Sequence, residues 1–354
     1  MNKTTHGLSN VITLAFLLFA ILTVSADNSP YIAKVWEYTP APSQFVHEYP
    51  EYEEGDTQED IRLKAEEQIA DNAQGMISLG GWGGYVIFSF DHPVVNVDGK
   101  ADFVVEGNAF YADKSIGASS GGSAEPGIVM VSYDANGNGK PDDVWYELAG
   151  SEYTNPKTVH HYSVTYERPS AEHIATPDSI LKYRIDTTFV KWTDNQSNTG
   201  YLVQIKSHKH AYYPEWMEED KMTFTGSRLP DNYEWTGSQY LLYSYAYGYA
   251  DNHPNDVSEA ALDIAWAVDA DGTPIHLDAI HFVKVYTALH QQCGMLGETS
   301  TEVTGARDLH PDATMGTEAL SVSRQATKQM RNGQLVIIRN NQTYNPIGIL
   351  INNN

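Results

Sequence analysis

The chain has 354 residues, of which 46 are acidic and 22 are basic, and its formal net charge at pH 7 is −24. A field of that sign repels phosphate backbones, which argues against nucleic acid as a partner. Because Cys293 is the only cysteine, an intrachain disulfide is excluded, and the fold must be held by its own core and by any metal ions it binds. The chain has 23 Tyr and 7 Trp but only 10 Phe; Tyr and Trp suit surfaces that bind sugars and planar rings, and they are also ordinary β-sheet residues.

The first 26 residues have the pattern of a secretory signal peptide. Lys3 supplies a positive charge, residues 11–24 form an apolar stretch too short for a comfortable membrane span, and Val24-Ser25-Ala26 offers small residues for cleavage. An uncleaved anchor helix is the alternative. No cysteine lies near residue 27, so no lipid anchor is expected there, and no later stretch is apolar enough to span a bilayer. We therefore expect an exported protein that is periplasmic, associated with the cell surface or extracellular.

Residues 27–55 are polar and rich in proline, which favours an extended lead-in without regular structure. The stretch from Asp56 to Ala70 is the one convincing helix before the core. Asp56 and Glu59 resemble a capping box at its start, and Gly75 is a plausible stop. Its apolar stripe, at four-residue spacing, consists of Ile61, Ala65 and Ile69.

From Gly80 onward, short alternating runs are broken by Gly, Asn, Asp and Pro, a texture typical of a mainly all-β protein of the β-sandwich or jelly-roll type. The predicted strands are Tyr85–Phe90, Phe103–Val105, Ile128–Tyr133, Tyr162–Tyr166, Tyr201–Ile205 and Ile280–Thr287. We expect one binding domain over residues 27–311 and a loosely ordered segment over 312–354. That segment ends in a hairpin, with Leu335–Arg339 and Thr343–Ile347 flanking a turn at residues 340–342.

The sharpest local signal lies at residues 134–143. Oxygen-bearing side chains stand at positions 1, 3, 5 and 9 and a glycine at position 6, a spacing that wraps a hard cation. The predicted calcium ligands are Asp134, Asn136, Asn138, Asp142 and the backbone carbonyl of Lys140. Trp145 replaces the glutamate expected at position 12, which argues against a helix–loop–helix switch and favours a structural calcium loop between two strands. A plain turn without metal is the alternative.

The run from Tyr243 to Tyr249 places a tyrosine at every second position. On a strand, these side chains would share one face and form an aromatic wall for a sugar or a large planar ligand. A tyrosine-rich inner face of a sheet is the equal alternative. The four candidate ligand-binding residues are Tyr243, Tyr245, Tyr247 and Tyr249.

Two further segments supply candidate ligand-binding residues. His208 and His210 would share one face of an extended segment and could hold a transition metal or approach a metal carried by a ligand. A pair without a third ligand is weak evidence, so exposed loop histidines are the favoured interpretation. The aromatic candidates are Tyr212, Tyr213 and Trp216 after these histidines, and Trp82 within Gly80–Gly84. Trp82 could equally be a ligand platform or a core residue.

Signals of catalysis are weak. The sequence has no His-Glu-x-x-His motif and no P-loop, and Cys293 has no motif around it. Carboxylates are abundant, as in any acidic protein, and a glycosidase could hide among them because its two acids need not be close in sequence. We therefore predict a protein that is not an enzyme.

Several dense motifs occur in a fixed order between about residues 50 and 310. They are Gly80–Gly84, Phe90–Val94, Gly107–Phe110, Glu125–Val129, Asp134–Ser151, Trp192–Asn195, Tyr249–Pro254 and Gly297–Glu302. Together they resemble a family of secreted or surface proteins of Bacteroidetes known simply as cell surface proteins. The C-terminal hairpin is similar, more loosely, to the short tails of exported Bacteroidetes proteins.

The resemblance implies a ligand by association, because such proteins are often encoded beside corrinoid-uptake components, including outer-membrane transporters. It makes vitamin B12 or a related corrinoid the leading ligand and outer-membrane uptake machinery an expected partner. We therefore expect a non-catalytic protein that captures a nutrient. The alternatives are a carbohydrate-binding module of a glycan-utilisation system and a structural or adhesion protein of the surface.

Overall fold

The computed structural model describes residues 28–112 and 121–314, together with the backbone of three strands between residues 327 and 344. Residues 1–26, expected to be a signal peptide, lie outside the described residues. Strands make up 37% of the described residues and helices 8%, so the prediction of a mainly all-β, sandwich-like fold is confirmed. No helix in the described part of the chain is long and apolar enough to cross a membrane.

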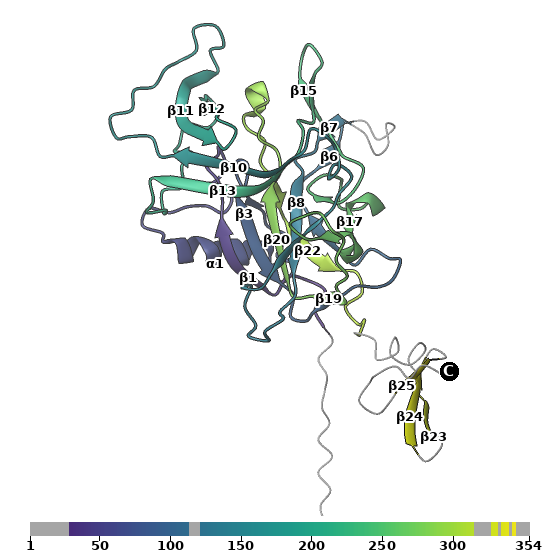
Figure 1. Ribbon diagram of the computed structural model, residues 1–354. Helices are drawn as coiled ribbons and strands as arrows, with labels where there is room; N and C mark the ends of the chain where they lie inside the picture. The colour runs from purple at the N-terminus through teal and green to yellow at the C-terminus, as the bar shows by residue number, and fades with distance from the viewer. Residues whose placement is uncertain (1–27, 113–120, 315–326, 332–333, 340–341, 345–354) are drawn as a thin grey trace, which may run out of the picture.

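The largest sheet is antiparallel and forms the centre of the molecule (Figure 1). Its strands, in spatial order, are β1 (Lys34–Thr39), β3 (Tyr85–Ser89), β20 (Phe282–Thr287), β8 (Gly127–Ser132), β9 (Trp145–Leu148) and β18 (Ala267–Val268), with β16 (Tyr249–Ala250) also paired to β8. On β20, Val283 and Val285 belong to the main core that includes the helix, whereas Tyr286 belongs to a second cluster. Because this strand is buried on both faces, it is almost continuously apolar.

A second antiparallel sheet packs against the first. Its strands, in spatial order, are β12 (Thr199–Ile205), β11 (Arg184–Asp194), β10 (Val159–Glu167) and β13 (Lys221–Arg228). Tyr162, Val164 and Tyr166 alternate along β10 and are all buried, as expected for the inner face of a strand. Gly226 on β13 leaves room for the ring of Tyr286, since a Cβ there would lie 2.7 Å from the tyrosine oxygen.

Smaller sheets and single-turn helices surround these layers. One sheet consists of β14 (Tyr233–Trp235), β15 (Tyr240–Tyr243), β7 (Gly121–Ser123) and β6 (Phe110–Tyr111), and another of β17 (Ala261–Leu262), β5 (Phe103–Glu106) and β22 (Gly305–Asp308). Two further sheets are pairs of strands: β19 (Ala279–Ile280) with β4 (Val94–Val95), and β2 (Ile77–Ser78) with β21 (Glu302–Val303). The short 3₁₀ helices are η2 (Ser258–Ala260), η3 (Ile264–Trp266) and η4 (Gly294–Leu296).

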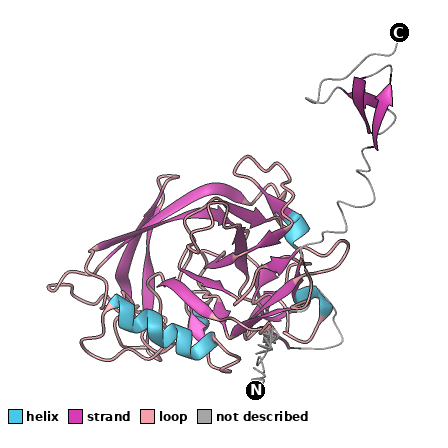
Figure 2. Cartoon of the chain, turned by 90° about the horizontal axis from the view of Figure 1, so that it is seen from below, coloured by secondary structure: helices cyan, strands magenta, loops and turns pink. Residues whose placement is uncertain are grey.

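The predicted helix is α1 (Gln58–Ile69), which lies along one side of the sheets (Figure 2). Its apolar stripe of Ile61, Ala65 and Ile69 is buried, as expected. The capping box starts one residue later than predicted: the Thr57 hydroxyl accepts the Asp60 amide, and the Asp60 carboxylate accepts the Thr57 amide. The helix ends well before Gly75.

The expectation that residues 27–55 lack regular structure was wrong. β1 pairs with β3 along its whole length and buries Val35 and Tyr38. It fits there because Pro40 and Pro42 come after the strand, and an edge strand needs hydrogen-bond partners on one side only.

At the predicted C-terminal hairpin, β24 (Gln334–Arg339) pairs with β25 (Gln342–Tyr344). Residues 340–341 of the predicted turn and residues 345–347 of the predicted second strand lie outside the described residues. One further strand, β23 (Thr327–Arg331), pairs with β24 in a segment expected to be loosely ordered.

Candidate functional site

The predicted calcium loop connects β8 to β9, so it lies between two strands and not between two helices. Its side chains are held by one another in an exposed turn. The Asp134 carboxylate accepts the amides of Asn138 and Gly139, and the amide groups of Asn136 and Asn138 donate to Asp142. The Lys140 carbonyl accepts the Asp142 amide at 2.9 Å. The oxygen atoms that the spacing predicted as ligands therefore lie on one compact loop.

The tyrosine run does not form a wall, and that interpretation was wrong. β15 ends at Tyr243, the chain bends, and β16 starts only at Tyr249. The Tyr245 hydroxyl donates to the carbonyl of Pro230, while Tyr247 packs on Trp266 with ring centroids 4.9 Å apart. Tyr249 is buried in the core. Because the run bends, the alternation that would align side chains on a strand does not apply.

The aromatic candidates Trp82, Tyr212, Tyr213 and Trp216 are all buried core residues. Trp82 packs edge-on against Tyr162, with centroids 4.9 Å apart. Trp82 is therefore a core residue of the sandwich, and a direct ligand contact by these four side chains is contradicted by their burial.

His208 and His210 are partly buried and share a carboxylate that the sequence did not reveal. Glu48 Oε1 lies 3.3 Å from His208 Nδ1 and 3.6 Å from His210 Nε2, and the three groups are close enough to hold a metal ion. His210 Nε2 also lies 2.6 Å from the carbonyl oxygen of Gln44. A metal on that nitrogen would displace this hydrogen bond, so the geometry favours a structural role.

An open groove of about 510 Å³ lies beside η4. In Figure 1, η4 is the yellow-green turn between the β14–β15 hairpin and the β11 region. Four large apolar side chains line the groove and remain accessible. They are Leu181, Trp235, Met295 and Leu296, which are 38%, 54%, 70% and 54% exposed. Contiguous exposed apolar surface on a soluble domain marks a binding site for a ligand or partner.

The β14–β15 hairpin holds two aromatic side chains that line this groove, Trp235 and Tyr240. Trp235 pairs with Tyr240 across the β14–β15 hairpin, and their ring centroids are 4.9 Å apart. Gly294 has a positive φ of 60°, and a Cβ there would lie 2.5 Å from the Tyr240 ring. Glycine therefore allows η4 to approach the hairpin closely.

Arg184 is the one positively charged side chain among the described residues that line the groove. Its Nε is buried and has no hydrogen-bond partner, and its contact with Asp178 is long at 3.9 Å. The Arg184 side chain therefore supplies a positive charge at the groove, which would attract an anionic group bound there.

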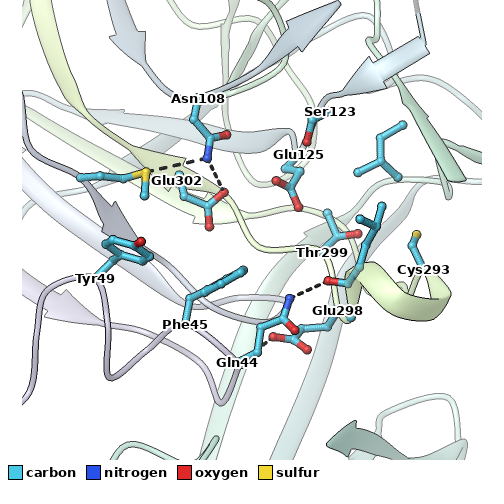
Figure 3. A pocket seen from close by; sticks show the side chains of 14 residues that line it. Gln44, Phe45, Tyr49, Asn108, Ser123, Glu125, Cys293, Glu298, Thr299 and Glu302 are labelled. Carbon is cyan, nitrogen blue, oxygen red and sulfur yellow. Dashed lines mark hydrogen bonds between the residues drawn. The ribbon is translucent and has the colours of Figure 1, made fainter. Parts of the chain in front are cut away.

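A second pocket, of about 300 Å³, lies on the other side of η4, and Leu296 lines both. Figure 3 shows Glu125, Glu302 and Asn108 facing the same space, with Glu298 beside Gln44. Burial raises the pKa of Glu125 and that of Glu298 to about 7. Burial, followed by repulsion from Glu125, raises the pKa of Glu302 well above its usual range.

Asp251 supports this acidic pocket from behind. Its carboxylate accepts the backbone amides of Asn108, Ala109 and Glu302 at 2.8–2.9 Å. Gly107 makes this approach possible, because a Cβ there would lie 2.3 Å from Asp251 Oδ1.

Sequence reasoning missed both the groove and the acidic pocket. The acids of the pocket come from positions 125, 251, 298 and 302, so no local spacing connects them. One signal was available: these acids and Asn108 all stand in motifs quoted above for the resemblance.

Comparisons with known proteins match no family model and no curated protein, so the resemblance stays a prediction and the site rests on its geometry.

Proposed function

We propose that this chain is an exported, non-catalytic binding protein that captures a corrinoid in the groove beside η4 and delivers it to outer-membrane uptake machinery. The observation that carries this proposal is the accessible apolar wall of Leu181, Trp235, Met295 and Leu296. A monomer exposes such a wall at a cost in solubility, which a ligand with a large apolar ring would offset.

The chemistry of a corrinoid suits this groove. Its broad ring can lie against Trp235 and Met295, since thioethers and aromatic rings adapt to large flat surfaces. Its nucleotide loop carries one phosphate, which matches the positive charge of Arg184 at the groove. The groove opens to solvent between the hairpin and η4, so a ligand larger than the groove can enter in part.

The test is calorimetric titration of the purified protein with cyanocobalamin, followed by gel filtration. We expect saturable binding and red colour that elutes with the protein. Absence of both would contradict the corrinoid proposal.

A matched ligand tests the role of Arg184. Dicyanocobinamide keeps the corrin ring and lacks the nucleotide loop with its phosphate. We expect Arg184→Ala to weaken cyanocobalamin binding by about tenfold or more and to leave dicyanocobinamide binding nearly unchanged. Equal losses of affinity for both ligands would show that Arg184 does not bind the phosphate.

A carbohydrate-binding role is the second candidate, and the stacked pair of Trp235 and Tyr240 supports it, because sugar rings also stack on such surfaces. A glycan array that retains the protein when cyanocobalamin does not bind would favour this function.

We also propose that the loop at residues 134–142 binds a structural Ca²⁺ ion, supported by the convergence of its side chains on one compact turn. Chelation of calcium should lower the melting temperature of the protein. Asp142→Asn should remove the part of that decrease that is due to calcium bound at residues 134–142. A melting temperature insensitive to both chelator and added calcium would contradict the proposal.

A further inference from the structure

Three carboxylates meet at the acidic pocket: Glu125 and Glu302 line it, and Asp251 lies behind them. One oxygen from each of Glu125, Asp251 and Glu302 lies within 4.8 Å of the other two. Two oxygens that each lie about 2.4 Å from one calcium ion are at most about 4.8 Å apart. The spacing of the three groups is therefore compatible with a shared ion.

Neighbouring donors hold these carboxylates in place. Asp251 is fixed by three backbone amides. Ser300 donates its hydroxyl to Glu302 Oε1 at 2.8 Å and its amide to Glu125 Oε1 at 3.4 Å. The second oxygen of Glu302 lies 3.5 Å from the Asn108 amide nitrogen, and the carboxyl groups of Glu125 and Glu302 are close enough to share a hydrogen bond. The ligand oxygens are thus oriented before any ion arrives, which lowers the cost of binding.

A second observation points to a missing positive partner. Gln44 Oε1 and Glu298 Oε2 are buried and have no hydrogen-bond partner, although both residues line this pocket and are almost fully buried themselves. The Gln44 oxygen is an acceptor, and Glu298 Oε2 is an acceptor when its carboxyl is ionised. A buried acceptor without a donor is costly, and a cation with its bound water would satisfy such acceptors.

The charge of the pocket has no compensation from side chains. Among the described residues that line it, none is Lys, Arg or His. Buried carboxylates need protons or a cation to balance them. All the candidate ligands are oxygen atoms, a set that suits Ca²⁺ and does not suit metals that prefer nitrogen or sulfur.

We propose that Glu125, Asp251 and Glu302 bind one Ca²⁺ ion, with Gln44 and Glu298 on the pocket wall around its water. The ion would tie together the segment before β8, the segment after β16 and the start of β21, which are far apart in the chain. This site is separate from the loop at residues 134–142 and does not depend on the corrinoid.

The test separates the two calcium sites with matched variants of the full chain. After chelation and desalting, CaCl₂ is titrated calorimetrically into the wild type, Asp134→Asn/Asp142→Asn and Glu125→Gln/Glu302→Gln. We expect the loop variant to keep one site and the pocket variant to lose one site relative to the wild type. If the loop binds no calcium, the wild type shows one site, and only the pocket variant loses it.

If the heats of calcium binding are too small to measure, the melting temperatures of the same proteins with calcium and with chelator provide a second test. The pocket variant should melt at a higher temperature than the wild type in chelator, because amides remove the repulsion, and it should gain less from calcium. If the double variant does not fold, the single variant Glu302→Gln replaces it in both measurements. A loop variant that binds no calcium, or a pocket variant that binds as much calcium as the wild type, would overturn the proposal.

Discussion

Tyr247 and Tyr249 are separated by one residue and have opposite environments. Tyr247 is 42% exposed, whereas Tyr249 is 2% exposed and its hydroxyl accepts the Glu152 amide at 3.0 Å. The bend after β15 turns one ring outward and the other into the core. Residue type and spacing alone therefore do not determine which tyrosine is available for a ligand.

We predict that Tyr249→Ala lowers the free energy of unfolding by about 3–5 kcal/mol, because it leaves a cavity in the core. Tyr247→Ala, the matched control, should change it by less than about 1 kcal/mol. Urea denaturation of both variants measures the difference. Equal losses would show that the run is packed as one unit.

Glu147 gives a second prediction for a single residue. Burial raises its pKa from 4.5 to about 7, against a hydrogen bond from the Ser227 hydroxyl. Between these two pKa values the folded state keeps the proton and the unfolded state has lost it. Stability therefore falls as the pH rises through this window, and the penalty persists above pH 7.

Glu147→Gln should remove this penalty and still accept the Ser227 hydroxyl. We expect the stability of the variant relative to the wild type to increase by on the order of 2 kcal/mol from about pH 5 to about pH 8. Denaturation curves at each pH measure it. Parallel pH profiles for the two proteins would contradict the assignment.

Six strands were predicted from their local pattern, whereas β11 and β13 of the second sheet were missed, although β13 alternates between buried and exposed residues. The six predicted strands correspond to β3, β5, β8, β10, β12 and β19–β20. The last is interrupted at His281, between β19 and β20. β1 was missed because the prolines around it dominated the interpretation of residues 27–55. The pattern of Val35 and Tyr38 becomes meaningful only once β3 is known to lie beside it.

The cap of α1 provides a prediction for a whole element. Thr57→Ala removes the hydroxyl that accepts the Asp60 amide and should destabilise the protein by about 1 kcal/mol. Thr57→Ser keeps the acceptor and should restore most of the loss. Chemical denaturation compares the three proteins, and an alanine variant as stable as the wild type would show that packing alone determines where α1 starts.

The groove and the acidic pocket are each built from segments that are far apart in the chain. The groove joins residues 181–184, 235–240 and 294–296, and the acidic pocket joins residues 44–49 with acids near 125 and 300. Only the tertiary fold brings these segments together, so the sequence predicted the sandwich class but neither the groove nor the acidic pocket. The calcium loop stays a prediction. The motifs contain all four acids of the pocket without revealing that they meet.

The proposed ligand binds in the groove beside η4 and not at the tyrosine run. The most direct measurement is the dissociation constant of cyanocobalamin for the wild type, Trp235→Ala and Tyr247→Ala, with folding checked by circular dichroism. Both side chains are exposed aromatics, so each variant controls for the other. We predict at least about tenfold weaker binding for Trp235→Ala and an unchanged constant for Tyr247→Ala. Weaker binding for Tyr247→Ala alone would place the ligand at the tyrosine run and contradict the account.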